Sequence, residues 1–298
     1  MSRSVAFAHI LRHDDGTSTG VWGLYTLKSA FQPIFAFHGG RLTIVAFEGL
    51  IRPFRDGAPQ SPGTFFDACQ GLDRLHVETL TRTLHLLNAG ACLPPEAAVF
   101  VNFDPSVFVD RSICEATLRE MRLVLHEAEI DPGRVVCEVT ERPTASQEAL
   151  YVFVETLRAN GFRIALDDFG AEESDIRRIE ALKPDIVKFD ARWIGHLMET
   201  GTGFALLATM VESFESGGIL TLFEGIEETW QLELAERAGV SMVQGFVLAR
   251  PELAPTGFAT LHEAPAASPR AAGTAGIRPA QPAREGRRAR AFGRRTAP

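Results

Sequence analysis

The sequence lacks the features that would place it among membrane or secreted proteins. No apolar run approaches the roughly 18 to 20 residues needed to cross a bilayer, and no apolar signal region follows the first residues. We therefore expect a cytoplasmic protein. The four cysteines show no Cys-x-x-Cys spacing and lie in apolar or helical surroundings, which predicts reduced core residues and neither a disulfide framework nor a zinc site.

Glycine motifs that hold nucleotide phosphates are missing as well. No Gly-x-Gly-x-x-Gly follows the first predicted strand, and no Walker loop occurs in the 298 residues. This disfavours a doubly wound nucleotide-cofactor domain. The length fits one large barrel domain or two ordinary domains, and a hydrophobic content of 45% is enough for a sizeable core.

The formal net charge of −8 is distributed unevenly along the chain. Residues 263–298 contain eight arginines and two glutamates, a net charge of +6, so residues 1–262 carry −14. The acidic body disfavours a broad nucleic-acid-binding face. The tail is rich in Ala, Pro, Gly and Arg, and we expect it to be disordered. It either contacts RNA or an anionic surface or forms a solvated extension, and the sequence names no partner for it.

Short apolar runs alternate with helical patterns along most of the chain. Only His38-Gly39-Gly40 separates the first two runs, which predicts a hairpin, whereas the later runs need crossover helices and hence parallel pairing. About eight strands over some 220 residues predict an α/β fold, a (β/α)₈ TIM-like barrel with one antiparallel strand. The predicted strands are residues 31–37, 42–47, 98–103, 135–139, 163–166, 185–189, 219–223 and 242–247. The predicted helices are residues 63–69, 75–89, 112–129, 146–160, 174–182, 202–216 and 229–238.

Seven of these strands end in polar residues. Because the carboxyl ends of the strands form one rim of such a barrel, we expect these side chains to share a site. Each one alone has a local explanation, such as a helix cap or a structural salt bridge, but seven such explanations at corresponding positions are improbable. The residues are Glu48, Asn102, Glu138, the pair Asp167 and Asp168, Lys188, Glu224 and Gln244.

Oxygen atoms dominate the predicted site. Five carboxylates and the Asn102 amide, with no cysteine or histidine among them, suit Mg²⁺ or Mn²⁺ and disfavour zinc or copper. This number of oxygens fits one or two ions, with Asp167 as the bridging ligand of a pair. Such pairs catalyse phosphoester hydrolysis, for which Lys188 would supply a further positive charge. The simpler reading of Asp168-Phe169-Gly170 is a turn that Asp opens and Gly completes.

These residues coincide with a known pattern. The chain resembles the EAL-domain family of cyclic di-GMP phosphodiesterases, from about residue 31 to residue 251, as a stand-alone EAL domain. The resemblance rests on several motifs in order: Phe31-Gln32-Pro33-Ile34, Glu48-Gly49-Leu50-Ile51-Arg52, Val101-Asn102, Glu138-Val139-Thr140-Glu141, Asp167-Asp168-Phe169-Gly170, Lys188-Phe189-Asp190, Glu224-Gly225-Ile226-Glu227 and Gln244-Gly245-Phe246.

The resemblance implies a role for each residue. Glu48, Asn102, Glu138 and Asp167 would hold one ion, with Asp167, Asp168 and Glu224 around the second. Glu48, Asp168, Lys188 and Glu224 would be the catalytic group, with Lys188 near the attacking water. Gln32, Leu50 and Arg52 would face the substrate, with Glu227 and Gln244 in support, and Glu141 would anchor the loop after Gly170. A homodimer and the product pGpG are also implied.

Two departures from the family pattern stand out. The name-giving triplet has Gly49 where alanine is usual, and we expect a small effect, limited to local backbone freedom. The loop after the paired aspartates continues as Ala171-Glu172-Glu173-Ser174, where active members carry glycine in place of Glu172. Two added carboxylates beside an acidic site oppose substrate approach or add competing ligands. Alternatively, they form the first turn of the next helix, where negative charge is favourable.

Three functions from two classes therefore remain. The first is metal-dependent hydrolysis of cyclic di-GMP, which the complete set of oxygen ligands favours. The second is a catalytically weak or inactive EAL domain that binds cyclic di-GMP as a receptor and signals to a partner protein. The third is a hydrolase for another phosphodiester. We expect an N-terminal extension at residues 1–28, the catalytic domain at residues 29–262 and the tail at residues 263–298.

Overall fold

The computed structural model describes residues 6–69, 72–107, 111–140, 147–171 and 176–258. Its strands are β1 (Ile10–Arg12), β2 (Ser18–Trp22), β3 (Tyr25–His38), β4 (Arg41–Arg55), β5 (Ala58–Pro59), β6 (Ala98–Phe103), β7 (Val135–Thr140), β8 (Arg163–Phe169), β9 (Ile186–Phe189), β10 (Leu220–Phe223), β11 (Met242–Val243) and β12 (Glu252–Leu253). Its helices are α1 (Pro62–Asp67), α2 (Leu72–Cys92), α3 (Arg111–Glu127), α4 (Gln147–Ala159), α5 (Ile176–Leu182), α6 (Ala191–Met198), α7 (Gly201–Ser216) and α8 (Thr229–Ala238).

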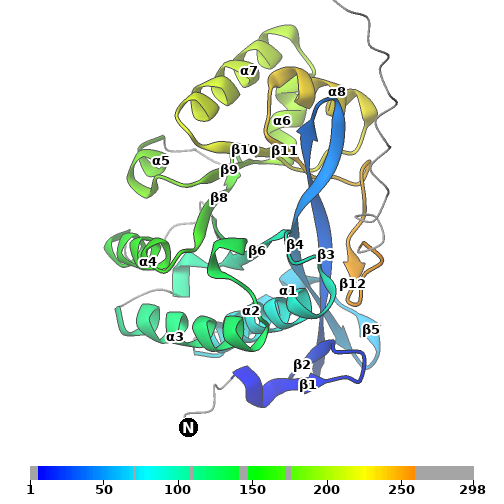
Figure 1. The fold of residues 1–298 in the computed structure, drawn as a ribbon, viewed down its shortest axis with the longest axis vertical. Helices are drawn as coiled ribbons and strands as arrows, with labels where there is room; N and C mark the ends of the chain where they lie inside the picture. The colour runs from blue at the N-terminus through cyan, green and yellow to red at the C-terminus, as the bar shows by residue number, and fades with distance from the viewer. Residues whose placement is uncertain (1–5, 70–71, 108–110, 141–146, 172–175, 259–298) are drawn as a thin grey trace, which may run out of the picture. The chain divides into compact units, whose positions relative to one another are not determined.

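Eight strands close into a barrel, as the alternating pattern predicts (Figure 1). Around the barrel the order is β3, β11, β10, β9, β8, β7, β6 and β4, and pairing of β4 with β3 completes the circle. Strands β4 and β6 to β11 run parallel to one another, whereas β3 is antiparallel to both of its neighbours, β4 and β11. The single antiparallel strand is therefore confirmed.

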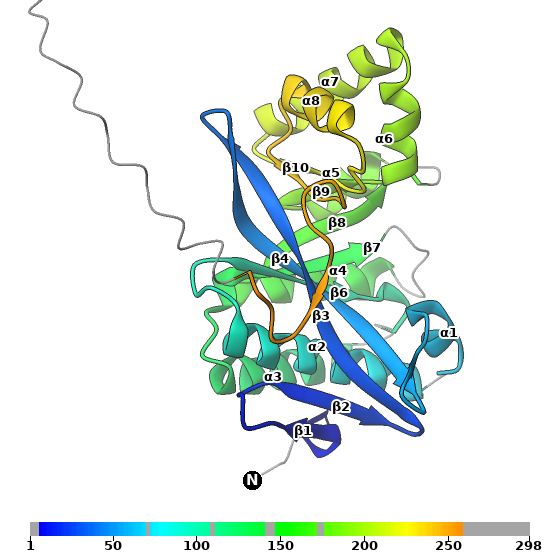
Figure 2. The same ribbon diagram turned by 90° about the vertical axis from the view of Figure 1, so that its right-hand side faces the viewer.

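A two-residue turn of Gly39 and Gly40 joins β3 to β4. Both glycines have positive φ, 57° and 74°, which is the conformation that a tight turn between twisted strands requires. The paired strands are about twice as long as the apolar runs predict, and they form a ribbon that extends beyond the barrel (Figure 2). The extension is stable because Leu27 and Ile51 pack there with Phe65, Val77 and other apolar residues of α1 and α2.

Residues 10–22 continue this ribbon. Strand β2 pairs with the beginning of β3, and β1 pairs with β2, both antiparallel. Trp22 lies against His9 and His76, with ring centroids 5.3 and 6.5 Å away. In the described ranges, no helix is both long and apolar enough to cross a bilayer.

The core has two layers, one inside the barrel and one between the strands and the helices. The outer layer is built from large side chains such as Phe47, Val99 and Phe153. The inner layer takes one residue or more from each barrel strand and is almost fully buried, as expected for a filled barrel interior. Its members are Ile34, Ala36, Ala46, Phe100, Val136, Ala165, Ile186, Leu222 and Met242.

Candidate active site

A ring of polar side chains lies directly above the inner apolar layer. Since side chains alternate along a strand, a residue two positions after an interior residue also points into the barrel, one layer nearer its mouth. All eight barrel strands follow this rule. The pairs are Ala46 and Glu48, Phe100 and Asn102, Val136 and Glu138, Ala165 and Asp167, Ile186 and Lys188, Leu222 and Glu224, Met242 and Gln244 and, on the antiparallel strand, Ile34 and Gln32.

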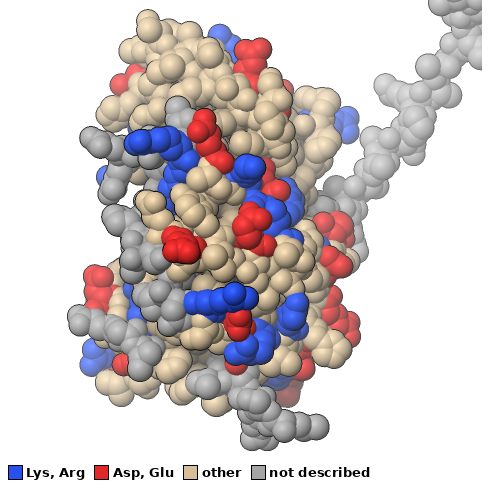
Figure 3. All heavy atoms as spheres, turned by 90° about the vertical axis from the view of Figure 1, so that its left-hand side faces the viewer, with Lys and Arg blue, Asp and Glu red and all other residues tan. Residues whose placement is uncertain are grey.

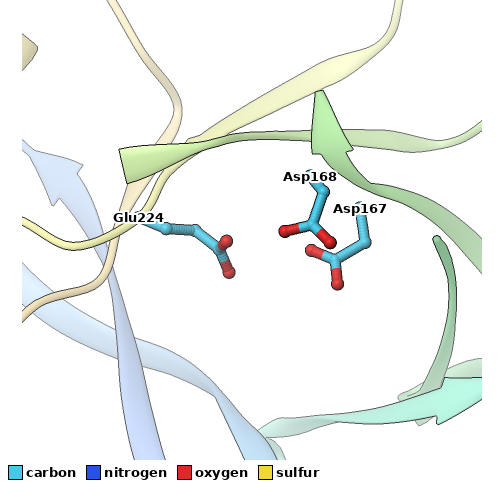
Figure 4. A group of neighbouring side chains, drawn as sticks. All are labelled: Asp167, Asp168 and Glu224. Atoms are coloured by element: carbon cyan, nitrogen blue, oxygen red, sulfur yellow. The ribbon is translucent and has the colours of Figure 1, made fainter. Parts of the chain in front are cut away.

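Asp167 and Asp168 are adjacent in sequence, yet both belong to the site. A regular strand would turn one of them outward. Here the pairing of β8 with β9 shifts register between Leu166 and Phe169, and Asp168 takes a positive φ of 61°. Oxygen atoms of Asp167, Asp168 and Glu224 consequently lie within 4.8 Å of one another (Figure 4).

Lys188 lies at the centre of the carboxylates and is almost completely buried. Its Nζ is 2.9 Å from Asp167 Oδ1, 2.7 Å from Glu224 Oε1 and 3.9 Å from Glu48 Oε1, and it contacts Glu138 Oε1 still more closely. Burial opposes the charge on this ammonium, but the surrounding carboxylates, Asp167 foremost, hold the pKa of Lys188 well above its usual range. Lys188 is therefore a cation at neutral pH.

Burial raises the pKa of two of the surrounding acids, Glu138 and Glu224. Burial raises the pKa of the fully buried Glu138 well above its usual value, although Lys188 acts in the opposite direction. Burial likewise raises the pKa of Glu224 to about 8, and the charges of Asp167 and Glu48 add to the effect. One ammonium group thus does not neutralise the four carboxylates that contact it.

A cavity of about 370 Å³, the first cavity, opens at this ring. Gln32, Glu48, Asp167, Asp168, Lys188, Glu224, Glu227 and Gln244 line it, together with Ala191, Gly225, Gly245 and Phe246. The Gln244 Nε2 donates to Glu48 Oε2 at 2.9 Å, and the Gln32 Nε2 donates to the Ala249 carbonyl at 3.3 Å. Most of the residues predicted from the sequence are therefore brought together.

Two more of the predicted residues line a neighbouring space. Asn102 and Leu50 are in the wall of a second cavity, of about 340 Å³, between β4, β6, α1 and α2. Arg52 lines neither cavity, and its Nη1 donates to the carbonyl of Ile51 at 2.9 Å. Glu141, Glu172 and Glu173 fall outside the described residues.

The donor set fits divalent ions. Every candidate ligand is an oxygen donor, the carboxylates outnumber the one cation among them, and Glu138 Oε2 is buried without a hydrogen-bond partner among the described residues. Hard cations such as Mg²⁺ or Mn²⁺ would satisfy these atoms. Asp167, Asp168 and Glu224 are close enough to hold one ion. Glu48, Asn102 and Glu138 lie beside Asp167 in the same ring.

The expectation for Gly49 is wrong in its reason. Gly49 is part of the regular ladder between β3 and β4 and has no positive φ. A Cβ atom there would lie only 2.9 Å from Cγ of His85, which projects from α2. The glycine therefore makes space for His85. Nothing in the sequence indicates this contact, because 35 residues separate Gly49 from His85 and no motif includes His85.

The face shown in Figure 3 carries charges of both signs. Lys and Arg groups lie beside Asp and Glu groups across it, with apolar and uncharged surface between them. Negative charge predominates instead inside the barrel mouth, where the carboxylates outnumber Lys188.

Comparison with known protein families assigns the chain to one of them. The EAL domain matches residues 24–251. The chain belongs to the EAL domain family. This accounts for the barrel with one antiparallel strand and for the ordered motifs along it.

Curated relatives of this EAL domain include cyclic di-GMP phosphodiesterases. The probable cyclic di-GMP phosphodiesterase PdeA of Escherichia coli (strain K12) is 25% identical over 209 residues, which are 69% of this chain and 28% of PdeA. The cyclic di-GMP phosphodiesterase RocR of Pseudomonas aeruginosa is 27% identical over 233 residues, 75% of this chain and 57% of RocR. The chain thus spans between about a quarter and just over half of these relatives.

Solved EAL structures have the same fold. BlrP1 of Klebsiella pneumoniae, in a manganese and cyclic di-GMP complex, superimposes with a TM-score of 0.67 at 26% identity, covering 76% of this chain and 56% of that chain. YkuI of Bacillus subtilis, in complex with substrate cyclic di-GMP and calcium, gives a TM-score of 0.66 at 27% identity with the same coverages.

Proposed function

We propose that this EAL domain hydrolyses cyclic di-GMP to the linear dinucleotide pGpG with the help of one or two divalent cations, Mg²⁺ or Mn²⁺. The observation that carries the proposal is the ring of oxygen donors around Lys188, delivered by strands far apart in sequence to one barrel mouth. The names of its relatives support the substrate. The reaction adds water across one phosphodiester: the water oxygen bonds to phosphorus, the bond to a 3′ oxygen breaks, and that oxygen takes a proton.

Glu48, Asn102, Glu138 and Asp167 would hold one ion, and Asp167, Asp168 and Glu224 the other. When bound, these ions stabilise negative charge on the phosphate and make a water nucleophilic near neutral pH. The bulge that turns both aspartates inward is what gives β8 two ligand positions.

Lys188 stays protonated, because its pKa is held well above the usual range. It therefore acts as a cation that orients the attacking water or balances phosphate charge, and not as a general base. Glu48 is held in turn by Gln244, whose Nε2 donates to Oε2 at 2.9 Å. Loss of Gln244 would free Glu48 to rotate.

The substrate would extend over both cavities. Cyclic di-GMP has two guanines, and the second cavity has the partly apolar walls that a base requires, from Leu50, Ile51, Phe66 and Phe103. Gln32 and Glu227 would contact the substrate in the first cavity. Arg52 would have to turn away from the Ile51 carbonyl to reach a phosphate.

The domain limits, the homodimer and the altered loop are also proposals. We retain residues 1–28, 29–262 and 263–298 as the three segments, and light scattering of the purified chain would test the dimer. Glycine in place of Glu172 is expected to raise the rate if the two loop glutamates oppose substrate approach. An unaltered rate would show that they do not.

The deciding experiment is incubation of the purified chain with cyclic di-GMP and either Mg²⁺ or Mn²⁺, with chromatography of the products. The proposal expects the linear dinucleotide, and no product when EDTA is present. Tight binding without a linear product under both metals would instead identify a receptor. If the chain neither binds nor hydrolyses cyclic di-GMP, both the enzyme and the receptor are excluded.

A further inference from the structure

The wall of the second cavity contains a histidine to which no role has been assigned. His85 lies on α2, is 4% exposed, and faces Gly49 of β4 and Phe31 of β3. It occupies the volume that an alanine methyl at position 49 would need. His85 packs so closely against position 49 that an alanine there would clash with it. The hydrogen bonds of its ring then indicate which nitrogen carries the proton.

A chain of hydrogen bonds behind the ring determines which nitrogen carries the proton. Asn88 Oδ1 accepts from the Ser18 amide at 2.7 Å, so Asn88 Nδ2 is the donor to the Ser18 carbonyl and to Ser29 Oγ, both at 3.0 Å. Ser29 Oγ therefore accepts a hydrogen bond from Asn88 Nδ2, and its own hydroxyl is left to donate one. His85 Nδ1, 2.9 Å away, is the acceptor of that proton.

Since Nδ1 accepts, the proton of the neutral ring is on Nε2. Burial, with the nearby Arg52 charge adding to it, lowers the pKa of His85 to about 3, so the ring is neutral at physiological pH. No described residue accepts from Nε2, and His85 forms part of the cavity wall. Because His85 lines the second cavity, its Nε2–H is the donor that this residue can offer to an occupant of the cavity.

The occupant that suits this donor is a base and not a phosphate. Arg74 and Arg82, the cations of the cavity, are already engaged with Glu78 and Asp104, which leaves little free positive charge for an anion. Guanine presents acceptors at O6 and N7, whereas adenine presents a donor, the N6 amino group, where guanine has O6. An N–H donor at that place distinguishes the two bases.

We propose that His85 is a specificity-determining residue, whose Nε2–H donates to the acceptor edge of a guanine of cyclic di-GMP in the second cavity and repels the amino group of an adenine. This inference rests on the proposed function. The histidine would act in binding alone, because it belongs to a cavity other than the one that holds the carboxylates and Lys188.

Two matched variants test it. His85→Gln keeps an N–H group at about the reach of Nε2, and His85→Asn keeps a polar group only at the reach of Nδ1. Binding of cyclic di-GMP and of cyclic di-AMP is measured by calorimetry in EDTA, after thermal melts show that each variant is folded. His85→Asn is expected to bind cyclic di-GMP about fivefold to tenfold more weakly, with no loss for cyclic di-AMP, and His85→Gln to stay within about twofold of wild type.

Kinetics and spectroscopy supply further readouts. With Mg²⁺ or Mn²⁺, His85→Asn should raise KM and leave kcat unchanged, and ¹⁵N spectra of the wild type should show His85 protonated at Nε2. The inference would be overturned if both variants bound cyclic di-GMP equally well, whether at the wild-type affinity or at an equally reduced one. It would also be overturned if the ¹⁵N spectra placed the proton on Nδ1. If wild type neither binds nor cleaves cyclic di-GMP, the proposed function itself fails, which is a separate outcome.

Discussion

At the scale of single residues, the central feature is an ammonium group enclosed by acids. Lys188 contacts four carboxylates and is almost fully buried. A buried charge is tolerated only when it is paired. Removing one partner destabilises the fold by more than the intact pair stabilises it, because the other charge is left buried and unpaired. Lys188 therefore serves the fold as well as the chemistry, because it lets the acids come together before any ion binds.

Lys188→Met should destabilise the metal-free protein by about 3 kcal/mol or more at pH 8, since it leaves the carboxylates without their cation. The folded pKa of Lys188 is raised, so its stabilisation is fully present below its unfolded pKa of about 10.5 and is lost only above it. Urea unfolding in EDTA measures the change. Lys183→Met, at an exposed lysine, is the control, and equal stability of the two variants would contradict the central role.

Glu48→Ala should abolish turnover of cyclic di-GMP, because it removes a proposed ion ligand and the acceptor of Gln244. Initial rates by chromatography with saturating Mn²⁺ provide the measurement. Glu233→Ala, on the exposed side of α8, should keep the wild-type rate. Full activity of Glu48→Ala would show that the site is assigned to the wrong residues.

At the scale of elements, the contact between β4 and α2 is tighter than the sequence indicates. Gly49 and His85 fit only as a pair, since a Cβ at position 49 would come within 3.2 Å of three ring or side-chain carbons of His85. The same histidine accepts from Ser29 of β3. One side chain of the helix thus connects both strands of the ribbon.

Gly49→Ala is expected to destabilise the protein by about 1 to 3 kcal/mol through overpacking. Combining it with His85→Ala should cost less than the sum of the two single changes, because the truncated side chain leaves space for the methyl group. Gly195→Ala in α6, where a Cβ meets nothing within 4 Å, should be neutral or stabilising by up to about 1 kcal/mol. Additive costs at 49 and 85 would exclude the proposed packing.

Much of the architecture could be predicted, because it follows from local patterns. The two glycines after His38 indicated the hairpin, and polar residues after apolar runs indicated the ring at the mouth. Helix α6 was missed: Asp190, which was interpreted only as part of a motif, caps it by accepting from the amides of Arg192 and Trp193. The bulge at Asp168, the length of β3 and β4, and the Gly49 contact depend on distant segments, which no local pattern contains.

At the scale of the whole molecule, the site works against the stability of the metal-free fold. Glu224 has a folded pKa of about 8, above its unfolded value near 4.5. Between these values the folded state binds more protons than the unfolded state, so this group makes stability fall as pH rises from about 4.5 to 8. The raised pKa of Glu138 acts in the same direction.

Thermal melts in EDTA should therefore show a declining midpoint between pH 6 and 8, and Mn²⁺ or Mg²⁺ should raise the midpoint more at pH 8 than at pH 6, because the ion replaces protons on the acids. Glu224→Gln should flatten the decline in EDTA. A metal effect that is the same at both pH values would show that the ions bind away from these carboxylates.

The two-residue spacing between the inner apolar layer and the polar ring also has a consequence for folding. If one strand paired two residues out of register, the same side chains would still point into the barrel, but each would lie one layer away from its native level. Such a shift would place a carboxylate at the level of Phe100 and Val136, or an alkyl group at the mouth. The first error would bury an ionised acid in hydrocarbon, with no cation in reach. The carboxylates therefore destabilise barrels with a strand out of register far more than they destabilise the native barrel. This difference helps the chain to adopt a single alignment of its strands.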